Sequence, residues 1–197
     1  MVDDPYTYDI TEFANEFTWA IAFWNLAENN ARWMLSGILG GHTAIHALAV
    51  DLGSRSLVEA LRSASRGMDD KNLRQHVEHF VKGYSRLGEY RNLYVHGLMS
   101  LQPVGDPDHR NAKKLQGYIM IEKAKGRLKA INQPITVNEM QMFKKHCMTL
   151  LDYGKAIKIA IGLDDVGIGE MLGMPEPLLE KPVWPDPPNQ RIHYIQD

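Results

Sequence analysis

Cysteine is almost absent from this chain, because Cys147 is the only one among 197 residues. A single cysteine excludes an intramolecular disulfide framework and a cysteine-rich zinc site. No apolar run approaches the roughly 20 residues that span a bilayer. Residues 1–9 are polar and acidic, unlike the basic and then apolar start of a secretory signal. We therefore expect a protein of the reducing cytoplasm without a membrane partner.

A strong excess of either charge is also absent, since the formal net charge is −2. This balance excludes a chain that binds nucleic acid over its whole surface, so such binding requires a local patch. One patch fits, because seven Lys or Arg residues and a single acid, Glu122, lie between Arg110 and Lys129. Two interpretations of the patch stay open: charges that protect a sheet edge from aggregation, or residues that touch RNA.

Apolar residues recur with helical spacing over most of the chain, and the length is sufficient for one domain with a buried core. The spacing predicts five helices: from Ile10 to about Leu39, from His42 to about Val50, from Ser54 or Ser56 to about Ser65, from Asp69 to His96, and from Thr136 to about Ile161. Ser54 or Ser56 is expected to cap the third helix. Alternating residues between the last two predict strands near 98–104, 117–121 and 128–131. We expect a mainly α fold, an antiparallel helical bundle with a small antiparallel β flap at about 98–133.

Local signals mark where several of these helices begin and end. Gly40 and Gly41 follow the first helix and are suited to the left-handed conformation that ends helices. Thr136 and Glu139 form a capping box, which predicts the start of the last helix. Gly83 and Gly88 weaken the fourth helix, or they allow another helix to approach it closely.

The composition divides the chain into three parts. Residues 1–9 are predicted to be a loose arm, residues 10–163 the helical domain, and residues 164–197 a tail rich in Pro and Gly. The tail should be extended on the surface, with Trp184 holding it in place.

Glu28 falls within the apolar stripe of the first helix, where a carboxylate needs a cation or hydrogen-bond donors. Arg32, four residues later, is the ordinary helical partner. Arg91, on the fourth helix, is the alternative partner.

Three polar residues near the end of the fourth helix form the candidate site: Arg91, Asn92 and His96. Asn92 and His96 are four residues apart and share one helix face. Arg91 and His96 are separated by about 140° around an ideal helix. Either the long arginine side chain reaches around, or a second copy of the helix completes the site. Arginine offers a permanent cation matched to phosphate, and histidine is suited to proton transfer near neutral pH. Gly97 is expected to end the helix.

The motif Arg91-Asn92-x-x-x-His96 resembles the Arg, polar residue and His signature of HEPN domains, which are helical bundles and in many cases metal-independent ribonucleases. The motif covers only residues 91–97, and the position two after the histidine is Leu98, where some toxin members carry tyrosine. The resemblance implies an endoribonuclease that works as a homodimer on RNA, in defence, stress response or a toxin–antitoxin pair with an antitoxin protein.

The resemblance also implies roles for the three residues. His96 would assist proton transfer at an RNA 2′-hydroxyl, which attacks its own phosphodiester to give a 2′,3′-cyclic phosphate. Arg91 would stabilise the charge that develops on phosphorus, and Asn92 would hold His96 or a phosphate oxygen. The alternative function is a non-catalytic HEPN-like module that binds RNA, a nucleotide or a protein.

Other chemistry has little support in the sequence. His42 and His46, and His76 and His79, have ligand spacing, but no Glu-x-x-His and no His-Glu-x-x-His pattern occurs, so we expect no metal site. Phosphate-binding loops and serine-nucleophile motifs are lacking, and no cofactor is expected.

Overall fold

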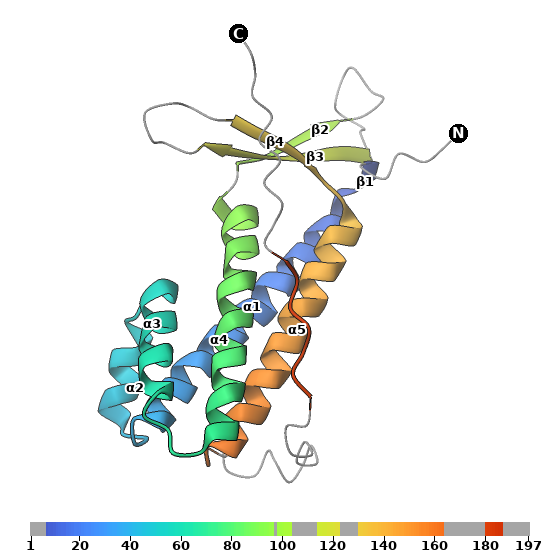
Figure 1. The fold of residues 1–197 in the computed structure, drawn as a ribbon. Helices are drawn as coiled ribbons and strands as arrows, with labels where there is room; N and C mark the ends of the chain where they lie inside the picture. Colours follow the sequence, from blue (N-terminus) through green and yellow to red (C-terminus); the bar gives the residue numbers. More distant parts are fainter. Residues whose placement is uncertain (1–6, 97, 104–113, 123–129, 164–179, 187–197) are drawn as a thin grey trace. The chain divides into compact units, whose positions relative to one another are not determined.

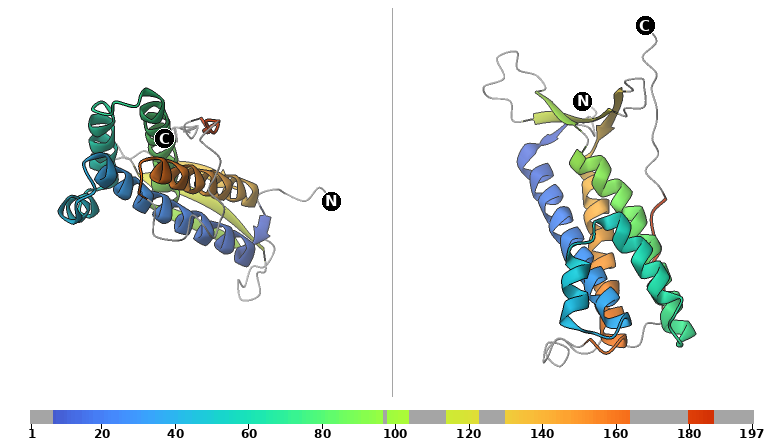
Figure 2. Two further views of the ribbon diagram at one scale, coloured as in Figure 1. Left: turned by 90° about the horizontal axis from the view of Figure 1, so that it is seen from below. Right: turned by 90° about the vertical axis from the view of Figure 1, so that its left-hand side faces the viewer.

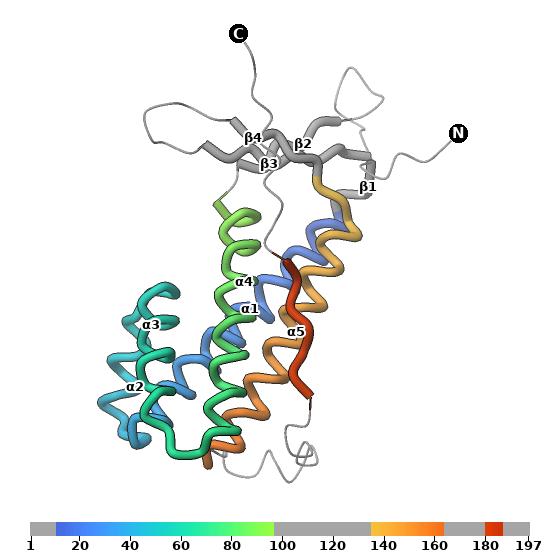
Figure 3. Tube along the Cα trace, in the orientation of Figure 1, coloured from blue at the N-terminus to red at the C-terminus, as the bar shows by residue number. Residues whose placement is uncertain are grey.

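The helices account for most of the structure, a computed structural model that describes residues 7–96, 98–103, 114–122, 130–163 and 180–186. Side chains are described for residues 11–96, 135–163 and 180–186 (Figure 3). The helices are α1 (Ile10–Ile38), α2 (Thr43–Val50), α3 (Ser54–Ser65), α4 (Lys71–His96) and α5 (Val137–Ala160) (Figure 1). The mainly helical fold class is confirmed.

Glycines end two of the helices, as the sequence predicts for the first. Gly40 and Gly41 follow α1 with φ angles of 104° and 74°, and Gly162 follows α5 with a φ of 83°. These are left-handed conformations that residues with a β-carbon rarely adopt. Gly97, the expected end of α4, lies outside the described residues.

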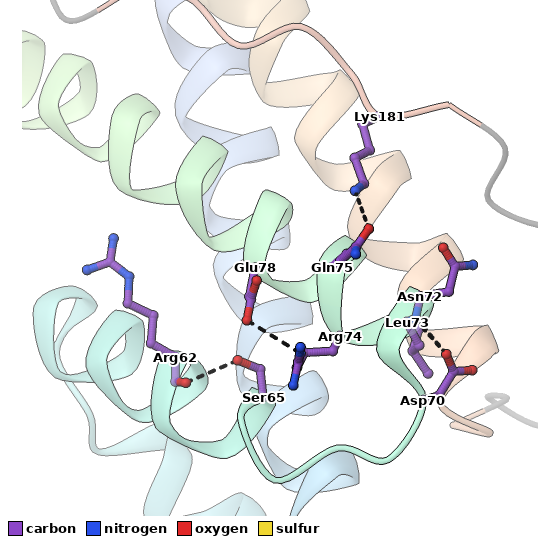
Figure 4. Close-up of polar contacts among 9 residues, drawn as sticks. All are labelled: Arg62, Ser65, Asp70, Asn72, Leu73, Arg74, Gln75, Glu78 and Lys181. Atoms are coloured by element: carbon purple, nitrogen blue, oxygen red, sulfur yellow. Dashed lines mark hydrogen bonds and ion pairs between the residues drawn. The ribbon is translucent and has the colours of Figure 1, made fainter.

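Side chains cap the starts of α4 and α5. Asp70 accepts hydrogen bonds from the backbone N–H groups of Asn72 and Leu73 at 2.8 and 3.0 Å (Figure 4). The capping box before α5 is confirmed, because Thr136 N–H donates to Glu139 Oε2 at 2.7 Å and Glu139 N–H donates to Thr136 Oγ1 at 3.1 Å.

The start of α3 differs from the prediction. Gly53 occupies the capping position and no side chain there accepts a hydrogen bond from the helix. Ser54 lies within α3, and its hydroxyl donates to Glu28 at 2.7 Å instead. A carboxylate acceptor from α1 has replaced the local backbone as the partner of this serine.

Antiparallel strands lie between α4 and α5, in the interval where the sequence alternates. They are β2 (Leu98–Pro103), β3 (Lys114–Glu122) and β4 (Ala130–Ile135). Both β2 and β4 pair with β3, with Leu98 opposite Met120 and Gly117 opposite Ile135. β1 (Thr7–Asp9), within the stretch expected to be a loose arm, also pairs with β3. Pairing satisfies backbone groups that an edge of β3 would otherwise leave open.

The chain divides into two compact units, and each is described separately. The first contains the described parts of Met1–Ile21, Glu89–Lys145 and Asp186–Asp197, and the second contains Ala22–Gly88 and the described parts of His146–Pro185. α2 and α3 belong entirely to the second unit, where they lie beside the later turns of α1 (Figures 1 and 2).

The core of the second unit is aromatic and close-packed. Trp24 of α1 stacks on Tyr84 of α4, with ring centroids 4.6 Å apart. Gly88 lies under this pair, since a β-carbon there would be 3.3 Å from the Trp24 ring. Close approach is thus the role of this glycine, as one of the two sequence interpretations predicts. Across the unit, Asn30 Nδ2 donates to the backbone oxygen of Leu151 at 3.3 Å.

Candidate active site

Aromatic packing fixes the last turns of α4 within the first unit. Leu93 and Tyr94 are buried, and the Tyr94 ring lies 5.2 Å from the ring of Phe143 on α5. Tyr90, one turn earlier, stacks on the same phenylalanine at 6.2 Å. Burial raises the pKa of Tyr94, with the charge of Glu139 acting in the same direction. Tyr94 is therefore a core residue that holds the helix, rather than an acid or base of the site.

The opposite face of the same turns carries the predicted site. Nη1 of Arg91 lies 2.9 Å from Nε2 of His96 and donates to Oδ1 of Asn92 at 3.2 Å. Asn92 and His96 are exposed, and Arg91 is half-buried. A single chain thus brings the three residues together, because the arginine side chain reaches around the helix.

The contact between Arg91 and His96 indicates which nitrogen of the imidazole accepts a hydrogen bond and which carries the hydrogen. A guanidinium has only donors, so Nε2 of His96 must accept, and the ring hydrogen must be on Nδ1. Nε of Arg91 is shut off from solvent and has no hydrogen-bond partner among the described residues. Because it is shut off from solvent, this N–H group is not open to a ligand that arrives from solution.

One contact near the site could not be foreseen from the sequence. The Tyr90 hydroxyl donates to the backbone oxygen of Asp186 at 2.9 Å. The residues are 96 positions apart, and no local pattern signals such a pair. This contact brings the C-terminal segment to the residue that precedes Arg91.

Glu28 has the ordinary partner of the two that the sequence offers. Its Oε1 lies 3.7 Å from Nη2 of Arg32 and accepts hydrogen bonds of 2.7 Å from the hydroxyls of Ser54 and Tyr84. The carboxylate is thereby compensated inside the second unit, and Arg91 has its own partners in the first.

The other histidine pairs have structural contacts. His46 stacks on Trp33 with ring centroids 3.6 Å apart. His76 Nδ1 lies 2.7 Å from the Tyr153 hydroxyl, and His79 Nε2 donates to the backbone oxygen of Pro182 at 2.7 Å. Among the described residues, no three His, Cys, Asp or Glu side chains gather in a way that could hold a metal ion.

Most of the basic patch from Arg110 to Lys129 lies outside the described residues, and only the backbone of β3 is described there. Both interpretations of the patch stay predictions. None of the described helices is long and apolar enough to cross a membrane.

Comparison with known proteins gives no relative. No family model, no curated protein and no solved structure matches this chain. The resemblance to HEPN domains therefore rests on residues 91–97 and on the helical pattern around them.

Proposed function

We propose that this protein is a HEPN-like, metal-independent endoribonuclease. The observation that carries the proposal is the convergence of Arg91, Asn92 and His96 on one solvent-facing side of α4, with 2.9 Å between the guanidinium and the imidazole. A fixed cation beside a neutral imidazole is the pair that phosphodiester cleavage by an internal hydroxyl needs.

The reaction uses both groups on one phosphate. The 2′-hydroxyl of RNA attacks the adjacent phosphorus while Nε2 of His96 takes its proton. The bond from the 2′-oxygen to phosphorus forms, the bond to the 5′-oxygen breaks, and the leaving oxygen receives a proton from the imidazolium or from water. The products are a 2′,3′-cyclic phosphate and a 5′-hydroxyl. Arg91 stabilises the negative charge on the phosphorane oxygens.

Arg91 must change partners for this reaction, since its Nη1 donates to the nitrogen that serves as the base. An arriving phosphate is a stronger acceptor for a guanidinium than a neutral imidazole is. The phosphate therefore draws Arg91 away, and Nε2 of His96 becomes available at the moment when substrate is bound. Asn92, through Oδ1, keeps the guanidinium close to the site.

A homodimer is the expected assembly, with two α4 helices lining one cleft. Val95 supports this, because it is 38% exposed and lies one turn after Arg91 on the same side of the helix. An exposed valine between polar catalytic groups is suited to contact with a second protomer. Growth inhibition by an RNA-cleaving toxin, countered by an antitoxin protein, is the corresponding cellular role in the cytoplasm.

A second candidate function is a non-catalytic module that binds RNA, a nucleotide or a protein through the same residues. The observation that favours it is that the acceptor nitrogen of His96 is already engaged by Arg91. In that case the site takes up an anion through the arginine, and no proton is transferred.

The test is cleavage of labelled RNA by the purified full-length protein in excess EDTA. Wild type should cut and leave cyclic phosphate ends, and His96→Ala should be inactive while keeping the same elution volume in size-exclusion chromatography. Arg55→Ala, which removes a solvent-exposed arginine in the second unit, is the matched control and should cut normally. RNA retardation without cleavage supports the binding module. If the protein neither cuts nor retards RNA, both candidates are overturned.

A further inference from the structure

A short segment near the C-terminus, residues 180–185, lies along α4 in the second unit. Nζ of Lys181 donates to Oε1 of Gln75 at 3.2 Å (Figure 4). Nε2 of His79 donates to the backbone oxygen of Pro182 at 2.7 Å, and the indole N–H of Trp184 donates to the backbone oxygen of His79 at 3.0 Å. The expectation that Trp184 holds the tail in place is confirmed.

A missing side chain makes room for the indole. A β-carbon at Gly83 would lie 2.3 Å from the Trp184 ring, which is far inside contact distance. The ring also stacks on His79, with centroids 5.5 Å apart, and meets the edge of Tyr153 at 6.1 Å. Gly83, His79 and Tyr153 therefore form a notch that is shaped for an indole, which we call the Trp notch.

The register of the segment matches the helix. Gln75, His79 and Gly83 are spaced four residues apart and share one face of α4, covering about 12 Å. The three steps from Lys181 to Trp184 in an extended, proline-containing chain cover about 9 Å. The extended segment thus contacts successive turns of one helix face, as peptide ligands do in aromatic grooves.

Much of the segment remains open to solvent. Val183 is 88% exposed, and Glu180 and Lys181 are exposed as well, whereas Pro182, Trp184 and Pro185 are half-buried. One indole, one proline carbonyl and one lysine make its hydrogen bonds to α4. This is the contact pattern of a short linear motif, whose affinity comes from a single inserted aromatic residue.

We propose that the Trp notch and the α4 face around it are a binding site for an extended peptide that carries a tryptophan between two prolines. Residues 180–185 occupy this site in the same chain. A partner protein that presents the same chemistry displaces them and binds in their place. This inference is independent of the nuclease proposal, because it concerns the second unit and requires no RNA.

The resident segment competes strongly with any peptide in solution. It belongs to the same chain as the notch, and attachment within one chain can give effective concentrations in the millimolar range. Removal of the resident indole should therefore make added peptide bind at least about tenfold more tightly.

The experiment uses full-length Trp184→Ala and a fluorescein-labelled synthetic peptide with the sequence of residues 180–186. Fluorescence anisotropy should report saturable binding, at least about tenfold weaker to wild type than to the variant. A peptide with alanine in place of its tryptophan should not bind. Absence of binding by the intact peptide to a Trp184→Ala variant with a wild-type circular dichroism spectrum would overturn the proposal.

Two further measurements keep the test decisive. Adding Gly83→Ala to the Trp184→Ala variant should abolish peptide binding, whereas adding Gly67→Ala should not, because a β-carbon at Gly67 meets only ordinary contact distances. If Trp184→Ala does not fold, wild type labelled with 5-fluorotryptophan serves instead. Millimolar unlabelled peptide should then shift the Trp184 fluorine resonance to the position of a solvent-exposed indole, and an unmoved resonance counts against the site.

Discussion

Arg91 reaches His96 across 2.9 Å although an ideal helix points their side chains about 140° apart. The backbone rises about 7.5 Å between them, a span that an arginine side chain covers and a shorter one does not. The guanidinium also contacts Asn92, so one side chain joins the three polar residues of this face. The pair depends on the length of the arginine and on its several donors.

Substitution of Arg91 by residues with fewer hydrogen-bond donors tests this dependence. We predict that Arg91→Gln lowers the rate of RNA cleavage by about 10²–10³-fold, the usual loss when a group that stabilises developing charge is removed. The cleavage rate of Arg91→Lys should lie between those of Arg91→Gln and wild type, because an ammonium keeps the charge but lacks the planar fork of the guanidinium. Single-turnover cleavage measures both.

The same variants should change stability only modestly. Arg91 is half-buried and contacts two exposed side chains, so its substitution should lower the free energy of unfolding by about 1 kcal/mol or less. Urea unfolding checks this, and a large loss of stability in Arg91→Lys would assign the arginine a structural role instead.

The Gly83 and Trp184 pair predicts a substitution whose effect changes sign. In wild type, Gly83→Ala forces the indole out and should destabilise the protein, because its β-carbon would lie 2.3 Å from the ring. In a Trp184→Ala background the same change meets no indole and should stabilise α4 by up to about 1 kcal/mol, the helix preference of alanine over glycine. Urea unfolding of the four proteins gives this double-mutant cycle, and equal effects in both backgrounds would contradict it.

Glu28 in the second unit should depend on the hydroxyl of Tyr84. We predict that Tyr84→Phe lowers the free energy of unfolding by about 1–2 kcal/mol, since a partly buried carboxylate loses a 2.7 Å donor while the ring still stacks on Trp24. Tyr84→Phe combined with Glu28→Ala should cost less than the sum of the single changes, because each change removes the hydrogen bond between the two side chains. Strict additivity in urea unfolding would show that the hydrogen bond contributes nothing.

The helix starts and ends that were predicted from the sequence depend on local signals. The partners of the capping box, Thr136 and Glu139, are three residues apart, and Gly40 and Gly41 act on their own backbone, so short patterns suffice. Helical periodicity likewise gave the helices to within a residue or two.

Contacts that depend on tertiary structure were not predictable. Ser54 resembles a helix cap by composition, but the proximity of Glu28, 26 residues away, decides where its hydroxyl donates. Gly83 was ambiguous for the same reason, since its partner lies about 100 residues later in the chain. The candidate site was readable because its three residues lie within two turns of one helix.

His76 gives the protein an acid-sensitive contact. It is buried beside Tyr153, and burial lowers its pKa from the ordinary value of 6.5, with Lys181 and His79 acting in the same direction. Below pH 6.5 the unfolded chain therefore binds a proton that the folded chain does not, and stability falls as the pH is lowered from there. His76→Asn keeps an acceptor near Tyr153 without titrating, so its urea midpoint should change less than that of wild type between pH 7 and 5. An identical pH dependence would assign the effect to other groups.

Cys147 offers a direct measure of how tightly α5 is packed. The thiol is buried, and burial raises its pKa above the ordinary value of 9.0. Because the thiolate is the reactive form, a thiol reagent at pH 8 should modify the folded protein at least about a hundredfold more slowly than the protein in 6 M guanidinium chloride.

The same shift has a consequence for stability in alkali. Above pH 9 the unfolded thiol ionises while the folded one stays protonated, so the folded state loses stability as the pH rises. The midpoint of urea unfolding should therefore fall between pH 8 and 10 in wild type and fall less in Cys147→Ala, measured against each protein's own value at pH 7. The reference to pH 7 removes the cost of the cavity that alanine leaves, because that cost does not vary with pH. Fast modification of the native thiol would show that α5 opens locally around Cys147 without unfolding of the chain. Equal alkaline slopes would show that ionisation of this thiol does not contribute to the loss of stability.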